Sequence, residues 1–168
     1  MNNIIDFIQE KLNRTESSLM LEKLKVGSKT NISEYQYFPK DYEELEKIVY
    51  DLIGERGNEA DLNDIDTSEI TNMERLFEGS NFDGDISNWD VSNVTCMNWM
   101  FSHSNFTGKN SNLNKWDVSK VRLMNGMFYY GKFEGNIDDW TPPKDFKYNL
   151  IFKESPLYNK PPKWYPSK

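Results

Sequence analysis

The chain has 168 residues, a net charge of -7 and a single cysteine. The negative charge disfavours a nonspecific grip on nucleic acid or on an anionic membrane, and one cysteine excludes an internal disulfide. Residues 1–14 have neither a basic n-region nor a continuous apolar segment, and no stretch approaches membrane-spanning length, so we expect a cytoplasmic protein without membrane or direct nucleic-acid contact.

Residues 1–57 are predicted to form an N-terminal capping region. An amphipathic helix is expected within residues 2–26 and a short strand at residues 32–38. A second helix is expected within residues 39–57, where Asp41 suits the first turn. The apolar stripe of this second helix consists of Tyr42, Leu45, Ile48, Val49, Leu52 and Ile53.

A repeat of 24 residues begins at Asp61. Residues 61–84 align with residues 85–108, a third copy follows the inserted residues 109–111, and a fourth copy is degraded. A period of this length predicts a solenoid, in which each unit buries its apolar face only against its neighbours. The recurring apolar positions are therefore expected to stack along the axis as three columns: Phe77, Phe101, Phe128 and Phe152; Met73, Met97 and Met124; and Trp89, Trp116, Trp140 and Trp164.

An aspartate recurs two residues before a serine in the first three copies. A carboxylate in this position accepts the backbone N–H two residues later and forms an Asx-turn. We therefore interpret Asp66, Asp90 and Asp117 as turn residues rather than as metal ligands or catalytic groups.

The segments WDVSNVTCMNWMF and WDVSKVRLMNGMF, with the lead-in DLNDIDTSEITNMERLF, share the pattern W-D-V-S-x-V-x-x-M-x-x-M-F. From residue 58 to its C-terminus the chain thereby resembles the BspA-like leucine-rich repeat family, a repeat of surface proteins and lipoproteins of bacteria and their phages. The resemblance implies two short parallel strands and a short helical turn in each repeat, which in the second copy would be residues 82–89, 94–97 and 98–102. The family is associated with protein binding and adhesion, and the resemblance carries over no catalytic residue.

The predicted fold class is therefore α+β: a short leucine-rich-repeat-like β-solenoid of about four 24-residue repeats with an N-terminal helical cap region. Residues 1–57 would be the N-terminal capping region, residues 58–155 the repeat solenoid and residues 156–168 a C-terminal cap. Pro161 and Pro162 cannot donate to a ladder, so this cap is expected to cover the last repeat and to keep the protein a monomer.

Motifs for chemistry are sparse. The sequence has no Cys–His pairing for a nucleophile, no zinc-spaced Cys/His set and no phosphate loop, although its many carboxylates leave a glycosidase pair open. Cys96 occupies a position that is Asn72 and Leu123 in other copies, which indicates an inert thiol. We expect no enzyme, no catalytic residue, no metal and no cofactor.

The expected function is a non-enzymatic protein–protein interaction module that binds a protein partner of unknown identity. Trp99 is aromatic where other copies have Arg75 and Gly126, so it either anchors a partner or folds onto the flank of the coil. Variable positions of a rigid repeat suit recognition. The candidate partner-binding residues are Trp99, Asn88, Lys115, His103, Lys109 and Asn110.

Two alternatives stay open. The first is an acidic, phage-type inhibitor or decoy that occupies a basic nucleic-acid-binding groove of a host protein, which the net charge of -7 favours. The second is a virion or cell-surface component, in which case the protein would be delivered as part of a phage.

Overall fold

The computed structural model describes residues 35–166. The helix expected within residues 2–26 lies outside the described residues. Most of the strand expected at residues 32–38 also lies outside them, and within its described part Tyr37 forms an isolated bridge to Ile65. The described chain contains helix α3 (Tyr42–Arg56) and two short 3-10 helices, η1 (Leu113–Lys115) and η2 (Pro156–Tyr158).

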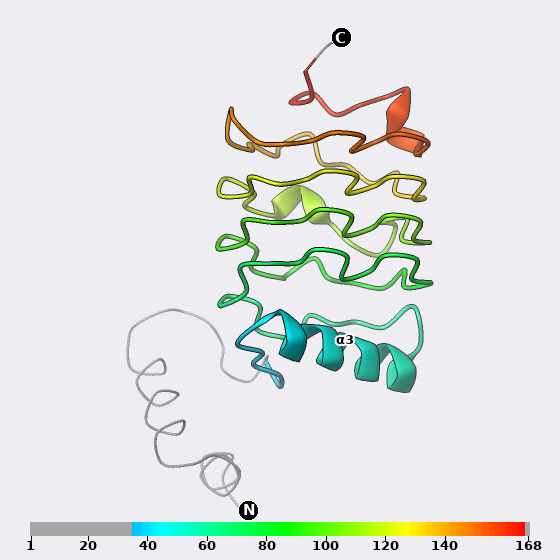
Figure 1. The fold of residues 1–168 in the computed structure, drawn as a ribbon. Helices are drawn as coiled ribbons and strands as arrows, with labels where there is room; N and C mark the ends of the chain where they lie inside the picture. The colour runs from blue at the N-terminus through cyan, green and yellow to red at the C-terminus, as the bar shows by residue number, and fades with distance from the viewer. Residues whose placement is uncertain (1–34, 167–168) are drawn as a thin grey trace, which may run out of the picture. The chain divides into compact units, whose positions relative to one another are not determined.

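Helix α3 lies within residues 39–57, where the sequence predicts a helix. The Asp41 carboxylate caps the first turn, because it accepts the Glu44 N–H at 2.9 Å. The helix ends at Gly57, whose φ of 87° suits glycine and whose N–H donates to the Ile53 carbonyl. The buried residues of the helix are Leu45, Val49 and Leu52, spaced three and four residues apart. Helix α3 thereby lies under the first repeat and shares its core (Figure 1).

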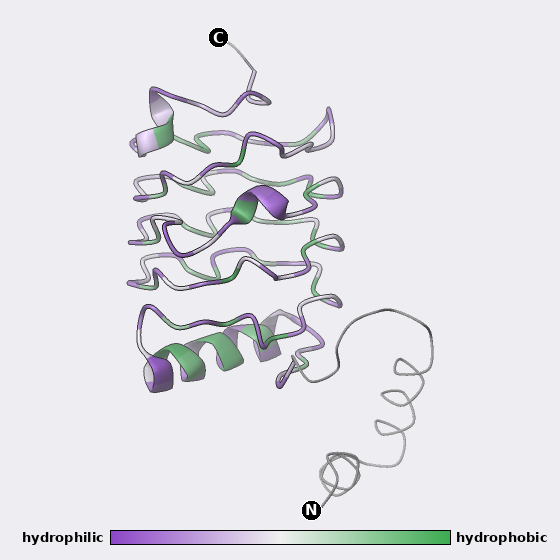
Figure 2. Ribbon diagram, turned by 180° about the vertical axis from the view of Figure 1, so that it is seen from behind, coloured by the Kyte–Doolittle hydropathy of each residue, from purple (hydrophilic) through white to green (hydrophobic). Residues whose placement is uncertain are grey.

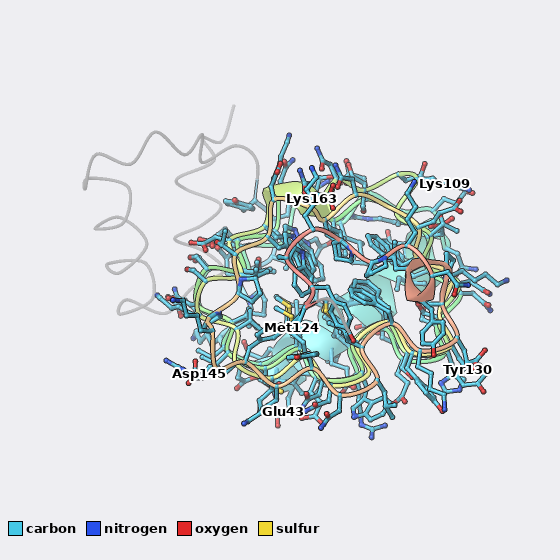
Figure 3. All side chains as sticks on the ribbon, turned by 90° about the horizontal axis from the view of Figure 1, so that it is seen from above. Glu43, Lys109, Met124, Tyr130, Asp145 and Lys163 are labelled. Atoms are coloured by element: carbon cyan, nitrogen blue, oxygen red, sulfur yellow. The ribbon has the colours of Figure 1, made fainter. Side chains whose placement is uncertain are left out.

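The four copies of the repeat form layers that are stacked one above another (Figure 1). We number them layer one (residues 58–84), layer two (85–111), layer three (112–135) and layer four (136–155). Hydrophilic and hydrophobic residues alternate at short intervals along each layer (Figure 2). Seen from above, Met124 lies inside the backbone of its layer, whereas Lys109 and Tyr130 project from different corners of the periphery (Figure 3). Each layer therefore encloses part of one continuous core.

Aromatic rings connect the layers through this core. The predicted phenylalanine column is confirmed: the rings of Phe77, Phe101, Phe128 and Phe152 stack at centroid distances of 5.4, 5.6 and 5.9 Å. A second column beside it joins Phe82, Phe106 and Phe133 at 6.1 and 5.9 Å. All seven rings are almost completely buried, so the packing of each layer depends on the layers above and below it.

The tryptophans add a hydrogen bond at every step. Each of the four indole N–H groups of the predicted tryptophan column donates to a backbone carbonyl of the preceding layer, at 2.7 to 3.3 Å, which satisfies the polar atom of a largely buried ring. The donor and acceptor pairs are Trp89 and Leu62, Trp116 and Ile86, Trp140 and Leu113, and Trp164 and Ile137.

Backbone hydrogen bonds join the layers along one edge, which we call the donor edge. Four N–H groups, two residues apart, donate at 2.7 to 3.0 Å to carbonyls of the next layer. The donors are Met73, Arg75, Phe77 and Gly79 in layer one; Met97, Trp99, Phe101 and His103 in layer two; and Met124, Gly126, Phe128 and Tyr130 in layer three. In each of these three layers, the residues that carry the second and fourth donors have a left-handed backbone, with φ between 50° and 66°. The chain turns at these residues, and all four N–H groups point toward the next layer.

The predicted α+β, leucine-rich-repeat-like β-solenoid is wrong. Residues 35–166 contain no β-strand, and the β-pairing between neighbouring layers there is limited to isolated parallel bridges such as that of Asn72 with Cys96. The strands expected at residues 82–89 and 94–97 reduce to the single bridging residues Asp85 and Cys96. The described fold consists instead of short irregular turns that are stacked on helix α3.

Side chains of the turns explain the difference. The Asp85 carboxylate accepts the Ser87 N–H at 2.8 Å, so a turn begins directly after the bridge and no second residue pairs. The three predicted Asx-turns are confirmed, with distances of 2.9 to 3.0 Å from Asp66, Asp90 and Asp117 to the N–H groups two residues later. Hydrogen bonds from the Ser119 hydroxyl and N–H also lower the pKa of Asp117 below its usual value. Polar side chains thus take the backbone donors that a strand would need.

Candidate protein-binding surface

Four aromatic rings meet on the outside of layers two and three. They belong to Trp99, His103, Tyr129 and Tyr130, and we call them the aromatic patch. The His103 imidazole stacks on Tyr130 at a centroid distance of 5.4 Å, and Tyr129 makes T-shaped contacts of 4.6 to 5.6 Å with the other three rings. Tyr130 keeps 49% of its surface exposed and projects outward (Figure 3). The patch is an aromatic surface whose rings hold one another in place.

The backbone of the donor edge turns these rings outward. Trp99, His103 and Tyr130 have left-handed φ values of 58°, 54° and 50°, while the intervening Met100 and Phe101 are fully buried. For residues other than glycine this conformation costs about 1–2 kcal/mol each. The hydrogen bond between the Ser102 hydroxyl and His103 Nδ1, at 2.8 Å, fixes the imidazole further. The sequence therefore retains large rings at positions where the backbone favours glycine.

Trp99 folds onto the flank of layer three, which was one of its two expected placements. Its ring lies over Gly126, where an added Cβ would come within 2.2 Å of Trp99 Cε3. On the other side, the Arg75 guanidinium lies 5.9 Å from the Trp99 centroid in a cation–π contact and pairs with Glu78. These neighbours leave the Trp99 ring half-buried. The ring also makes a T-shaped contact with the ring of Tyr129.

We expect Gly126→Ala to lower the free energy of unfolding by about 2–4 kcal/mol, because the new methyl group both requires a left-handed alanine and overlaps the Trp99 ring. The matched control is Gly79→Ala, which has a similar φ of 66° but open space around the added Cβ, and which should cost about 1 kcal/mol. Urea unfolding of both variants measures the difference. Equal losses would mean that Trp99 does not occupy the space over Gly126.

The structure brings together two of the six predicted partner-binding residues, Trp99 and His103. Lys109 and Asn110 lie at another corner and are bonded to layer one. Lys109 Nζ lies 3.3 Å from both Glu59 and Asp83, and its hydrogen bonds to these carboxylates raise its pKa. The Asn110 amide donates to the Asp83 carbonyl at 2.6 Å. The inserted residues are thus held against the stack.

Asn88 and Lys115 are exposed residues of the corner that precedes each buried tryptophan. The Asn88 N–H donates to Asn63 Oδ1 at 2.8 Å, and Lys115 ends η1. No hydrogen bond, ion pair or ring contact found within residues 35–166 joins either side chain to the aromatic patch. These two residues therefore form no common surface with Trp99.

Tyr129 and Tyr130 were missed by the sequence analysis. They occupy the positions of Ser102 and His103 in the preceding copy, and of Glu78 and Gly79 in the first. Like Trp99, each is an aromatic residue at a position where other copies are polar or lack a side chain. The signal was present in the alignment of the repeats.

Other groups that could bind a metal or react are few in the part of the chain that the structure describes. No cluster of three or more His, Cys, Asp or Glu side chains suited to a metal ion occurs there. The Cys96 thiol is half-buried 3.6 Å from Glu74 Oε2; burial, and then the charge of Glu74, raise the pKa of this thiol. A raised pKa disfavours the reactive thiolate. Among the same residues, no helix has the length and apolar character to cross a membrane.

A family model described as "Mycoplasma protein of unknown function, DUF285" matches residues 44–164. The match covers most of helix α3, all four layers and the C-terminal segment up to Trp164. No curated protein and no solved structure matches the chain.

Proposed function

The chain belongs to the DUF285 family, and from that premise we propose that it is a non-enzymatic protein–protein interaction module whose aromatic patch binds a protein partner. The observation that carries the proposal is the half-exposed Tyr130, held by His103 and Tyr129 on a buried scaffold. Tyrosine and tryptophan, together with arginine, are enriched at the energetic centres of interfaces. A ring that is already fixed loses little conformational entropy on binding.

The repeat pattern supports the same function. The segments around Trp89 and Trp116 resemble the BspA-like leucine-rich repeat family, which is associated with protein binding and adhesion, and we propose that the chain is related to that group. A rigid stack with variable outward positions suits such a role, because the core ladders stay constant while the surface residues change.

The test compares two exposed tyrosines. The full chain, its Tyr130→Ala variant and its Tyr50→Ala variant are immobilised, and the proteins that each captures from a lysate of the source organism are quantified by mass spectrometry. Tyr50 is a matched control, since it is 78% exposed on helix α3, away from the patch. For the true partner we expect Tyr130→Ala to weaken binding by about tenfold or more and Tyr50→Ala to leave it unchanged.

A captured protein counts as the partner only if its dissociation constant, measured with the purified protein, shows the same difference. Equal capture by all three baits would contradict a role for the patch.

A second candidate is the acidic decoy of a basic nucleic-acid-binding groove. Residues 35–143 contain nine Lys and Arg against twenty Asp and Glu, which favours it. Several of these carboxylates, such as Asp66, Asp90 and Asp117, also accept backbone N–H groups and so have a structural role. Salt separates the two candidates: a decoy complex should weaken steeply with ionic strength, and a complex anchored by aromatic rings only slightly.

A further inference from the structure

The donor edge is left open in layer four. In layers one to three the four N–H groups of this edge donate to the next layer. Their equivalents in layer four belong to Tyr148, Leu150, Phe152 and Glu154, and no acceptor for them is found among residues 35–166. Leu150 and Glu154 have φ values of 61° and 57°, which match the left-handed residues of the filled layers. The open row therefore already has the conformation in which its counterparts bind carbonyl oxygens.

The C-terminal segment covers the core above this row without supplying acceptors. The Tyr165 ring lies 5.5 Å from that of Tyr148 and 5.2 Å from that of Phe152. Leu150 nevertheless keeps 49% of its surface exposed. A ligand on the open row would thus meet N–H donors with an apolar side chain beside them.

The charge of this end is opposite to that of the remaining described chain. Residues 144–166 contain five lysines against Asp145 and Glu154, whereas residues 35–143 have eleven more acidic than basic groups. All five lysines are exposed, and Lys147 and Lys153 immediately precede the first and last donors of the row. Positive side chains and N–H donors both favour a ligand rich in negatively charged and carbonyl oxygens.

We propose that the open donor edge of layer four binds an acidic segment of a partner protein, whose main-chain carbonyls accept from the four N–H groups while its carboxylates pair with Lys147 and Lys153. The spacing of the row is that of a polypeptide, because the same spacing is filled by polypeptide carbonyls between layers. In the filled layers the left-handed residues recur four positions apart, as at Trp99 and His103, so acidic segments with glycine at such positions fit best. This site is separate from the aromatic patch and does not depend on it.

Two other occupants fit less well. A second copy of the chain would have to present the underside of layer one, where helix α3 lies (Figure 1). A nucleic acid that extends beyond layer four would meet the acidic surface of residues 35–143. Binding of either occupant is an alternative outcome of the binding test.

The binding test uses the full chain and a fluorescein-labelled peptide of ten residues that alternates Glu with Gly. We expect the peptide to bind with a dissociation constant below about 1 mM, and Lys147→Glu/Lys153→Glu to weaken binding at least about tenfold. The matched control Lys120→Glu/Lys132→Glu makes the same charge change outside layer four and should have a much smaller effect. No binding of the acidic peptide, equal effects of both double variants, or preferred binding of a Lys–Gly peptide or of oligothymidylate would overturn the proposal.

Amide hydrogen exchange tests the row itself. In the free full chain the N–H groups of Leu150, Phe152 and Glu154 should exchange faster than those of Gly126, Phe128 and Tyr130, which donate to layer four. Addition of the Glu–Gly peptide should slow the first group and leave the second unchanged. Protection of the row before any peptide is added, by another part of the chain or by self-association seen in sedimentation, would overturn the proposal.

Discussion

Replacing Phe101 with alanine should lower the free energy of unfolding by about 3–5 kcal/mol, as expected for a buried phenylalanine. The Phe101 ring is fully buried and stacks on Phe77 below, Phe128 above and Phe106 beside it, at 4.4 to 5.6 Å. Its removal leaves a cavity at the centre of both phenylalanine columns, which the neighbouring layers cannot close without losing their backbone hydrogen bonds. Denaturant unfolding at equilibrium measures the loss.

The control for this prediction is Tyr50→Ala, which removes a ring of similar size from the exposed face of helix α3. A surface change of this kind should alter stability by no more than about 0.5 kcal/mol. If the two variants lost equally little stability, the stacked phenylalanines would not be what holds the layers together.

We expect the full chain to be a monomer, and we expect removal of residues 156–168 to convert it into oligomers. In the full chain the Trp164 ring stacks on Trp140 at 6.0 Å, and the Tyr165 ring meets Phe152. Without the segment, Trp140 and Phe152, both now buried, would be exposed at the end of the stack. A flat aromatic surface with open backbone groups favours association with other copies. Light scattering of the truncated chain measures this change in mass.

A chain that ends at Tyr165 serves as the control, because it keeps both covering rings. It should remain monomeric with the thermal midpoint of the full chain. If the chain that ends at Ser155 also stayed monomeric with an unchanged thermal midpoint, the C-terminal segment would not be a cap.

The parts of the fold that follow from periodicity were predictable. Phe101 and Phe128 had to lie in one column because each turn of the repeat places equivalent residues above one another, and the aspartates had to form turns because their carboxylates reach the N–H two residues on. The absence of strands was not predictable in this way. Whether the residues around Asp85 pair as a strand depends on a competition between ladder and side-chain hydrogen bonds, which the repeat pattern does not reveal.

The surface was predictable only in part. Trp99 stands out because other copies lack an aromatic residue there, but its contact with Gly126 depends on the left-handed backbone of both residues. Arg75, Trp99 and Leu150 have no residue type that indicates such a conformation. In the same way, Lys109 looks like a free loop residue because its partner Glu59 is 50 positions earlier in the chain.

The hydrogen bonds between layers also bear on how the chain is made. Those between backbone groups join residues that are 23 positions apart, as for Met73 and Cys96, to 28 positions apart, as for Ser104 and Lys132. Contacts of such short range close early and at low entropic cost. During synthesis helix α3 leaves the ribosome before the repeats, and each layer can settle on its predecessor as soon as about one further repeat has emerged. The stack is thus suited to assembly in the order of translation, with the finished part serving as the template for the next layer.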